Sequence, residues 1–152
     1  MTKTSNSASY SERVFPGLSF FLATLFAPAA LYLIVLAFDD LWALITFVVS
    51  ELAIIFLGLF AAPTLSLSSK TLSIGNVQIP TQYVKAITGV DPSAQQSEKG
   101  PKLNPSAYVR FQVGVKGLIK VELNDPNDPT PYWLISSRNP DLVAKKFADL
   151  TS

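Results

Sequence analysis

The chain of 152 residues contains no cysteine and no histidine. Without cysteine it has no disulfide and no thiolate nucleophile, which fits a reducing compartment. Without histidine it lacks the commonest general base, the commonest metal ligand and the usual pH switch. Zinc sites and Ser-His or Cys-His nucleophile systems are therefore excluded in their ordinary forms. We expect a protein that is not an enzyme and has no catalytic residues, cofactor or metal.

Charge is also sparse. Charged residues make up 15% of the chain, and the formal net charge is only +1, so nucleic acid is not an expected partner. After Pro63 there are ten Lys and Arg residues against seven Asp and Glu. This mildly basic balance makes anionic lipid a candidate partner of the C-terminal part.

Two long apolar runs hold most of the hydrophobic residues. Residues 14–38 include no charged residue, and residues 41–62 include only Glu51. At a rise of about 1.5 Å per residue, each run can cross a hydrocarbon core of roughly 30 Å. We therefore predict a two-helix transmembrane hairpin over 14–62, with a tight turn at Asp39–Asp40 and the lipid bilayer as first partner.

The flanking charges predict the orientation of this hairpin. Lys3 and Arg13 precede the first run, Lys70 and Lys85 follow the second, and the turn carries no Lys or Arg. The positive-inside rule then places both termini in the cytoplasm, with residues 1–13 as a cytoplasmic tail. The predicted location is the cell (inner or plasma) membrane, with a multi-pass topology.

The main alternative for the first run is a cleaved signal peptide. Lys3 and Arg13 would be its basic region, residues 14–26 its apolar core and Ala27–Ala29 its cleavage site. However, the apolar run continues through Leu31–Leu36, beyond any such site. This continuation favours a spanning helix.

Beyond Pro63 the apolar pattern changes from helical to alternating, which is typical of half-buried strands. Residues 107–113 and 119–123 alternate and predict a hairpin with one wet face. The polar stretch 91–105 has almost no large apolar side chain and predicts a mobile loop.

A helix is predicted at residues 140–150, after the N-cap residue Asn139. We therefore predict a cytoplasmic α+β domain over 63–152. It would hold about six antiparallel strands, in one sheet or a partial barrel, closed by this C-terminal helix.

Glu51 lies near the middle of the second run, where an ionised carboxylate is costly. It lies eleven residues after Asp40, and Pro28 lies eleven residues before Asp39, so a hairpin brings Glu51 and Pro28 to one depth. Because proline cannot donate to the carbonyl of Thr24, a protonated Glu51 could hydrogen-bond that free acceptor. The functional alternatives are a proton or cation relay, or a polar contact with another membrane subunit.

The proline-rich run before the last predicted strand carries the carboxylates of Asp125 and Asp128. It lacks the spacing, glycine and terminal glutamate of an EF-hand, so side-chain-to-backbone turns are favoured over a metal site. Tyr132 and Trp133 alternate along the strand, so we expect one in the core and the other at the surface. With Arg138 these residues form a candidate interaction corner.

Two further groups invite a lipid-headgroup hypothesis. Ser136–Arg138 precede a helix N-terminus and could bind a phosphate, although capping and an Arg138 salt bridge are the favoured explanation. Arg110, Lys116 and Lys120 could face anionic lipid, although an ordinary solvated surface is favoured there too.

The sequence DPNDPTPYWLISSRNP at 125–140 resembles the DPxDPTPYWLxSxRxP signature of an actinobacterial family of small two-helix membrane proteins of unknown function. Tyr10–Arg13, Leu72–Gly75 with Ile79–Pro80, and Asn104–Tyr108 are also similar to that family, so the resemblance covers nearly the whole chain.

The chain departs from the family at Val109–Val113, where an Arg-Pro-Trp type motif is expected. The architecture is also similar to membrane-tethered bacterial pleckstrin-homology-like domains. Neither resemblance implies an activity.

These observations lead to a first hypothesis of a non-enzymatic, membrane-anchored interaction module. The alternative is a small accessory subunit of a larger membrane transport or envelope-synthesis complex, or a homo-oligomer, in contact through the helices and Glu51. A lipid-headgroup-binding domain is a further alternative. An enzyme acting on lipid or envelope precursors is least favoured, because the sequence assembles no carboxylate pair, nucleophile-base pair or phosphate loop.

Overall fold

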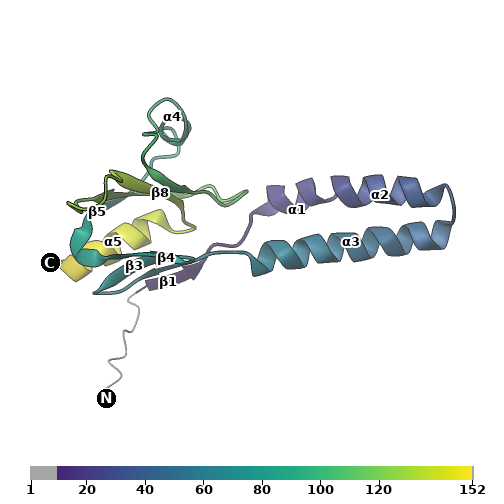
Figure 1. Ribbon diagram of the computed structural model, residues 1–152, viewed down its shortest axis with the longest axis horizontal. Helices are drawn as coiled ribbons and strands as arrows, with labels where there is room; N and C mark the ends of the chain where they lie inside the picture. The colour runs from purple at the N-terminus through teal and green to yellow at the C-terminus, as the bar shows by residue number, and fades with distance from the viewer. Residues whose placement is uncertain (1–9, 152) are drawn as a thin grey trace, which may run out of the picture. The chain divides into compact units, whose positions relative to one another are not determined.

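The computed structural model describes residues 10–151, which form two compact units (Figure 1). The helical unit comprises residues 15–62 together with the short segment 112–114. The two-sheet unit comprises the other described residues. Each unit is described separately below.

Three helices form the helical unit. The first two follow each other with only Leu25 between them, and the third runs beside the second (Figure 1). Asp39 caps the third helix, because its Oδ1 accepts a hydrogen bond from the Trp42 N–H at 2.9 Å. Asp40 follows in the first turn, where a carboxylate suits the positive end of the helix. The helices are α1 (Leu18–Thr24), α2 (Phe26–Leu36) and α3 (Asp40–Phe60).

Close approach holds the helices together at a few points. A Cβ atom on Gly58 would lie 2.4 Å from the end of the Phe20 ring, so this ring would have to move to admit a larger residue between α1 and α3. Tyr32 and Phe47 make an edge-to-face ring contact at 6.2 Å between α2 and α3.

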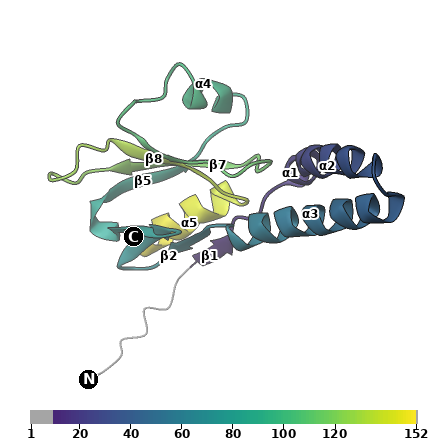
Figure 2. The same ribbon diagram turned by 45° about the vertical axis from the view of Figure 1, so that its right-hand side comes forward.

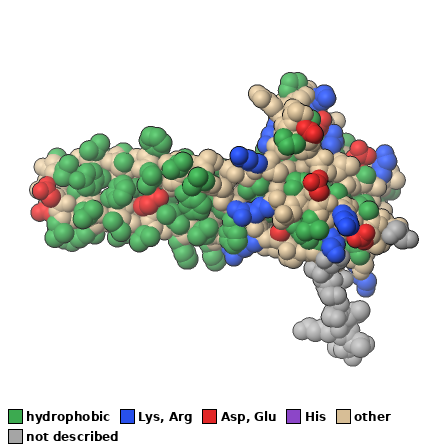
Figure 3. Space-filling model, turned by 180° about the vertical axis from the view of Figure 1, so that it is seen from behind, with side chains coloured by type: hydrophobic (Ala, Val, Ile, Leu, Met, Phe, Trp, Pro, Cys, Tyr) green, Lys and Arg blue, Asp and Glu red, His purple; other side chains and the backbone are tan. Residues whose placement is uncertain are grey.

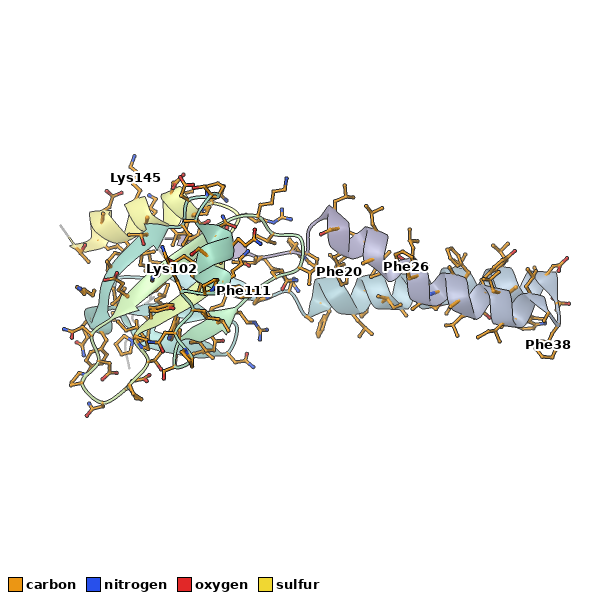
Figure 4. The ribbon with its side chains drawn as sticks, turned by 90° about the horizontal axis from the view of Figure 1, so that it is seen from above. Phe20, Phe26, Phe38, Lys102, Phe111 and Lys145 are labelled. Carbon is orange, nitrogen blue, oxygen red and sulfur yellow. The ribbon has the colours of Figure 1, made fainter. Side chains whose placement is uncertain are left out.

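The outer faces of these helices are apolar. Phe26 and Phe38 are 81% and 87% exposed and project outward (Figure 4). Hydrophobic side chains cover the visible face of the helical unit, with few charged groups among them (Figure 3). The spans Leu18–Leu36 and Asp40–Phe60 are both long and apolar enough to cross a membrane.

The first sheet is an antiparallel meander of four strands. Leu65 and Leu67 point into the core while Ser66 meets Ser73 across the strands, Oγ to Oγ at 2.7 Å, which is the predicted alternation. Gly75 has a positive φ of 58° in the turn before the fourth strand. The strands are β1 (Tyr10–Arg13), β2 (Thr64–Leu67), β3 (Thr71–Ile74) and β4 (Val77–Pro80).

The second sheet has the order β5-β7-β8-β6 and follows a 3₁₀ turn, η1 (Thr81–Tyr83). Its first three strands pair antiparallel, whereas β6 pairs parallel to β8, with Tyr108 opposite Trp133. The predicted hairpin between 107–113 and 119–123 is therefore wrong, because the later strand β8 lies between the two. The strands are β5 (Val84–Gly89), β6 (Tyr108–Arg110), β7 (Leu118–Leu123) and β8 (Tyr132–Ser136).

The prediction of an α+β class with a closing C-terminal helix is confirmed, whereas about six strands in one sheet or a partial barrel is wrong. The described residues form eight strands in two open sheets. One extra strand is formed by Tyr10–Arg13, in the segment predicted as an N-terminal tail. It pairs with β2, a long-range contact that local periodicity does not signal.

The main core lies between the two sheets and contains the C-terminal helix α5 (Pro140–Thr151), as Figures 1 and 2 show. Val143 and Phe147 of α5 are buried there, as their helical spacing predicts. A second, smaller cluster lies on the other face of the second sheet, where Leu103 packs against Leu118 and Leu134.

The stretch 91–105, predicted to be a mobile loop, forms this cover. It contains the short helix α4 (Gln95–Lys99), and Lys120 of β7 binds Glu98 at 2.9 Å. The short helix and the contacts with the sheet were not predicted, because the few side chains that make them follow no helical or strand periodicity in the sequence.

Candidate functional site

The polar pair predicted between the two apolar runs is present in the helical unit. The Thr24 hydroxyl donates to Glu51 Oε1 at 2.9 Å and also lies 2.9 Å from the Phe21 carbonyl oxygen. The prediction named the Thr24 carbonyl as the partner atom, whereas the hydrogen bond uses the hydroxyl. Helix α1 ends at Thr24. Pro28, which lies one helical turn later in the chain, is fully buried.

The second carboxyl oxygen of Glu51 is buried and has no hydrogen-bond partner among residues 10–151. An oxygen buried without a partner is costly, and more so in an apolar setting. The contact between Thr24 and Glu51 therefore satisfies only half of this side chain.

The acidic corner forms two side-chain-to-backbone turns, as the prediction favoured. Asp125 Oδ1 accepts from the Asn127 N–H, and Asp128 Oδ1 accepts from the Thr130 N–H, both at 2.9 Å. The hydrogen bonds from Thr130 hold the pKa of Asp128 below its ordinary value. Within the described part of the chain, no three His, Cys, Asp or Glu residues are grouped as ligands for a metal ion.

The prediction that either Tyr132 or Trp133 is available at the surface is wrong. Trp133 is 4% exposed and packs in the main core against Tyr108, with ring centroids 5.2 Å apart. Tyr132 is 8% exposed on the opposite face of β8, under the segment that contains α4. Alternation did separate the two rings, but both faces of this central strand are covered.

Tyr132 also anchors that covering segment. Its hydroxyl accepts from the Asn104 N–H at 2.8 Å and donates to the Lys102 carbonyl oxygen at 3.4 Å. The ammonium of Lys120 lies 4.5 Å from the ring centroid. Lys120 therefore contacts Tyr132 and Glu98 of α4, and its ammonium is not part of an open surface for anionic lipid.

The candidate phosphate site before α5 is occupied by the chain itself. Ser136 and Ser137 are buried, and the Ser137 hydroxyl donates to Glu12 Oε1 at 2.5 Å while accepting from the Asn139 N–H at 3.2 Å. The Ser137 hydroxyl is therefore bonded to Glu12 and to the N–H of Asn139 two residues later, and it is not open to a phosphate. Arg138, next in the chain, is exposed.

Glu12 is the centre of a cluster that sequence reasoning missed. Its Oε2 accepts from the Tyr10 hydroxyl at 2.8 Å, and the side chain of Asn139 also bonds to Tyr10. Burial and the bond to Glu12 raise the pKa of Tyr10 to about 12. Because Glu12 and Ser137 are 125 positions apart, no local pattern predicts their contact. Tyr10–Arg13 and 125–140 did, however, both carry the family resemblance.

A cavity of about 470 Å³ lies at the start of α5. Its polar lining includes Asp91, Gln95, Lys116 and Asp141, which mixes one ammonium with two carboxylates. The hydroxyl and N–H of Ser93 bind Asp91 Oδ1 and lower the pKa of Asp91. Because carboxylates outnumber the ammonium in this lining, the cavity is not suited to an anionic lipid headgroup.

Comparison with known proteins adds a family but no activity. No curated protein matches the chain, and no solved structure does, so the resemblance to pleckstrin-homology-like domains finds no support. A family model described as "Protein of unknown function (DUF3093)" matches residues 9–147, which is most of the chain. On that match, the chain belongs to the DUF3093 family.

Proposed function

We propose that the helical unit anchors this protein in a lipid bilayer and that the two-sheet unit is a non-enzymatic binding module held at the cytoplasmic membrane surface. One observation carries the proposal. Of the most apolar window in each span, only 11% and 6% is buried within the structure. The core helix of a water-soluble protein buries most of such a surface, whereas a membrane helix leaves it to lipid.

The second span argues against a cleaved signal peptide. The proposed cleavage site at Ala27–Ala29 lies inside α2, and α3 runs beside the same helix. Removal of the first span would leave the equally apolar α3 with even more exposed surface. Two spans that pack together are instead what a helical hairpin requires.

The chain path supports a hairpin with both ends on one side. Strand β1 leads into α1, α3 leads into β2, and these strands pair with Arg13 opposite Thr64. The Val14 N–H also donates to the Pro63 carbonyl oxygen at 2.9 Å. These contacts hold residues 13–14 beside residues 63–64, so the first span begins in the chain next to the point where the second span ends. Basic residues outside the spans then favour the cytoplasm for that side.

The contact surface of the module is proposed at the exposed acidic turns. With Tyr132 and Trp133 buried, the reachable part of the predicted corner is the Asp125–Thr130 segment and Arg138. The turns hold Asp128 exposed and ionised, which suits a basic surface on a protein partner.

Topology mapping tests the anchoring directly. Because the chain has no cysteine, Phe38→Cys at the helical turn and Lys145→Cys on α5 each give a single labelling site. We expect the protein to resist alkaline carbonate extraction. A membrane-impermeant maleimide should label Phe38→Cys in intact cells and Lys145→Cys only after lysis. Extraction by carbonate would refute the anchor, and labelling of Lys145→Cys in intact cells would refute the orientation.

A second candidate function is an accessory subunit that contacts a membrane complex, or a second copy of the chain, through Glu51. The observation in its favour is that Glu51 Oε2 has no partner in the described part of the chain. A pull-down in gentle detergent compares wild type with Glu51→Leu and Asp128→Ala. Loss of partners only with Glu51→Leu supports the subunit function, and loss only with Asp128→Ala supports the binding module.

A further inference from the structure

Residues Gln112–Gly114, in the loop between β6 and β7, belong to the same compact unit as the helices. The Gly17 N–H donates to the Val113 carbonyl oxygen at 2.8 Å. Gly17 is the N-cap residue of α1 and offers no side chain as a cap. Because the first N–H groups of a helix lack intrahelical partners, the loop supplies an acceptor where the apolar span begins.

Two glycines keep the loop close to this helix start. A Cβ atom on Gly17 would lie 2.0 Å from the Gly114 carbonyl oxygen, and one on Gly114 would lie 2.6 Å from Ser19 Oγ. Gly114 also has a positive φ of 74°, which other residues rarely adopt. These close approaches keep the loop beside residues 17–19.

The side chains at this level are apolar and open. Val113 is 58% exposed, and Leu18, the first residue of α1, is 74% exposed. An apolar side chain fixed at the entry point of a membrane helix lies at the boundary between headgroups and acyl chains. In water, these open side chains would add to the exposed apolar surface of the protein.

We propose that the tip of the β6–β7 loop is a second membrane contact, in which Val113 inserts into the lipid interface beside α1. This inference rests on the proposed anchoring of the helical unit. The exposed loop tip thus contacts the same bilayer that receives α1, and the bond between Gly17 and Val113 holds the loop tip beside the start of that helix.

Site-directed fluorescence quenching tests this contact in the full chain. Single cysteines at Val113, at Leu33 in α2 and at Asn127 in the polar turn are labelled with an environment-sensitive dye. The proteins are placed in nanodiscs of phosphatidylcholine and phosphatidylglycerol containing nitroxide lipids. We expect dyes at Leu33 and Val113 to lose fluorescence, while the dye at Asn127 reports the aqueous level. Quenching at Leu33 without quenching at Val113 overturns the loop contact and leaves the anchor intact, whereas no quenching at Leu33 overturns the anchor.

A matched pair of glycine variants tests what holds the loop in place. Gly17→Ala should reduce quenching at Val113 and leave quenching at Leu33 unchanged, because the new Cβ collides with the backbone of Gly114. Gly100→Ala is the control, since its Cβ meets only the Gln96 carbonyl oxygen at 3.2 Å. Equal quenching at Val113 in both variants would show that the Gly17 contact does not position the loop.

Discussion

The two tryptophans of the chain lie in contrasting surroundings. Trp42, in the first turn of α3, is 63% exposed, whereas Trp133, in the central strand β8, is 4% exposed. The same contrast extends to the units that hold them. Large apolar side chains of the helical unit mostly point outward, while those of the two-sheet unit are mostly enclosed between the sheets and α5.

This contrast indicates that water favours the folded state of the two-sheet unit, whereas the helical unit, if anchored as proposed, depends on a lipid environment. The two-sheet unit gains stability by removing apolar surface from water, as a water-soluble domain does. The helical unit removes little such surface by itself, so under the proposed anchoring its stability comes from lipid, backbone hydrogen bonds and a few helix contacts. Mutations of one residue type should therefore have different effects in the two units.

The largest expected effect is at the tryptophan pair. Trp133→Ala leaves a cavity in the main core and should lower the free energy of unfolding of the two-sheet unit by about 3–5 kcal/mol. Trp42→Ala is the matched control and should change this free energy by less than about 0.5 kcal/mol, because most of that ring is exposed. Urea unfolding in detergent, followed by near-ultraviolet circular dichroism, measures both. Equal losses would contradict the contrast between the units.

The next effect concerns the Glu12 cluster, which joins β1 to the start of α5. Glu12→Ala removes the acceptor of both Tyr10 and Ser137, and Ser137 is fully buried. Leaving that hydroxyl without its partner should cost about 1–3 kcal/mol in the same urea measurement. Ser11→Ala, on the exposed side of the same strand, is the control and should be nearly neutral. A neutral Glu12→Ala would show that the cluster does not stabilise the fold.

The sequence predicted those features that depend on local pattern. The two apolar spans, the alternation of apolar residues after Pro63 and helix α5 all follow from periodicity and from cap residues. The Thr24–Glu51 pair also followed, because a short turn fixes the register of a hairpin. Counting from the turn put Glu51 level with Pro28 and so near the Thr24 carbonyl, whereas the hydrogen bond uses the Thr24 hydroxyl.

Features that depend on distant contacts were not predicted. Pairing of β1 with β2, the position of β8 between β6 and β7, and the contact of Glu12 with Ser137 join segments that are far apart in the chain. The burial of Tyr132 was not predicted for the same reason, since the residues that cover it come from the polar segment before β6. Tertiary context decides such pairings, and neither propensity nor alternation reports it.

A smaller effect is expected inside the helical unit. A double-mutant cycle of Thr24→Val and Glu51→Leu should give a coupling energy of roughly 0.6 kcal/mol, the size of an interhelical hydrogen bond in a membrane protein. Glu51→Gln keeps an acceptor for the Thr24 hydroxyl and should retain most of the coupling. Thermal unfolding in detergent, followed by far-ultraviolet circular dichroism, provides the measurement. Coupling near zero would show that the two side chains act independently.

The smallest expected effect is an alkaline loss of stability at Tyr10, confined to the two-sheet unit. The pKa of Tyr10 rises from 10.0 to about 12 on folding, because burial and Glu12 favour the neutral phenol. The folded state therefore holds this proton more tightly, so the contribution is complete below pH 10 and disappears as the pH rises toward 12. Since Tyr10 is partly exposed, we expect at most about 0.5 kcal/mol after solvent screening. Tyr10→Phe, measured by urea unfolding across this range, should flatten that part of the pH dependence, and an unchanged slope would assign the alkaline loss to other groups.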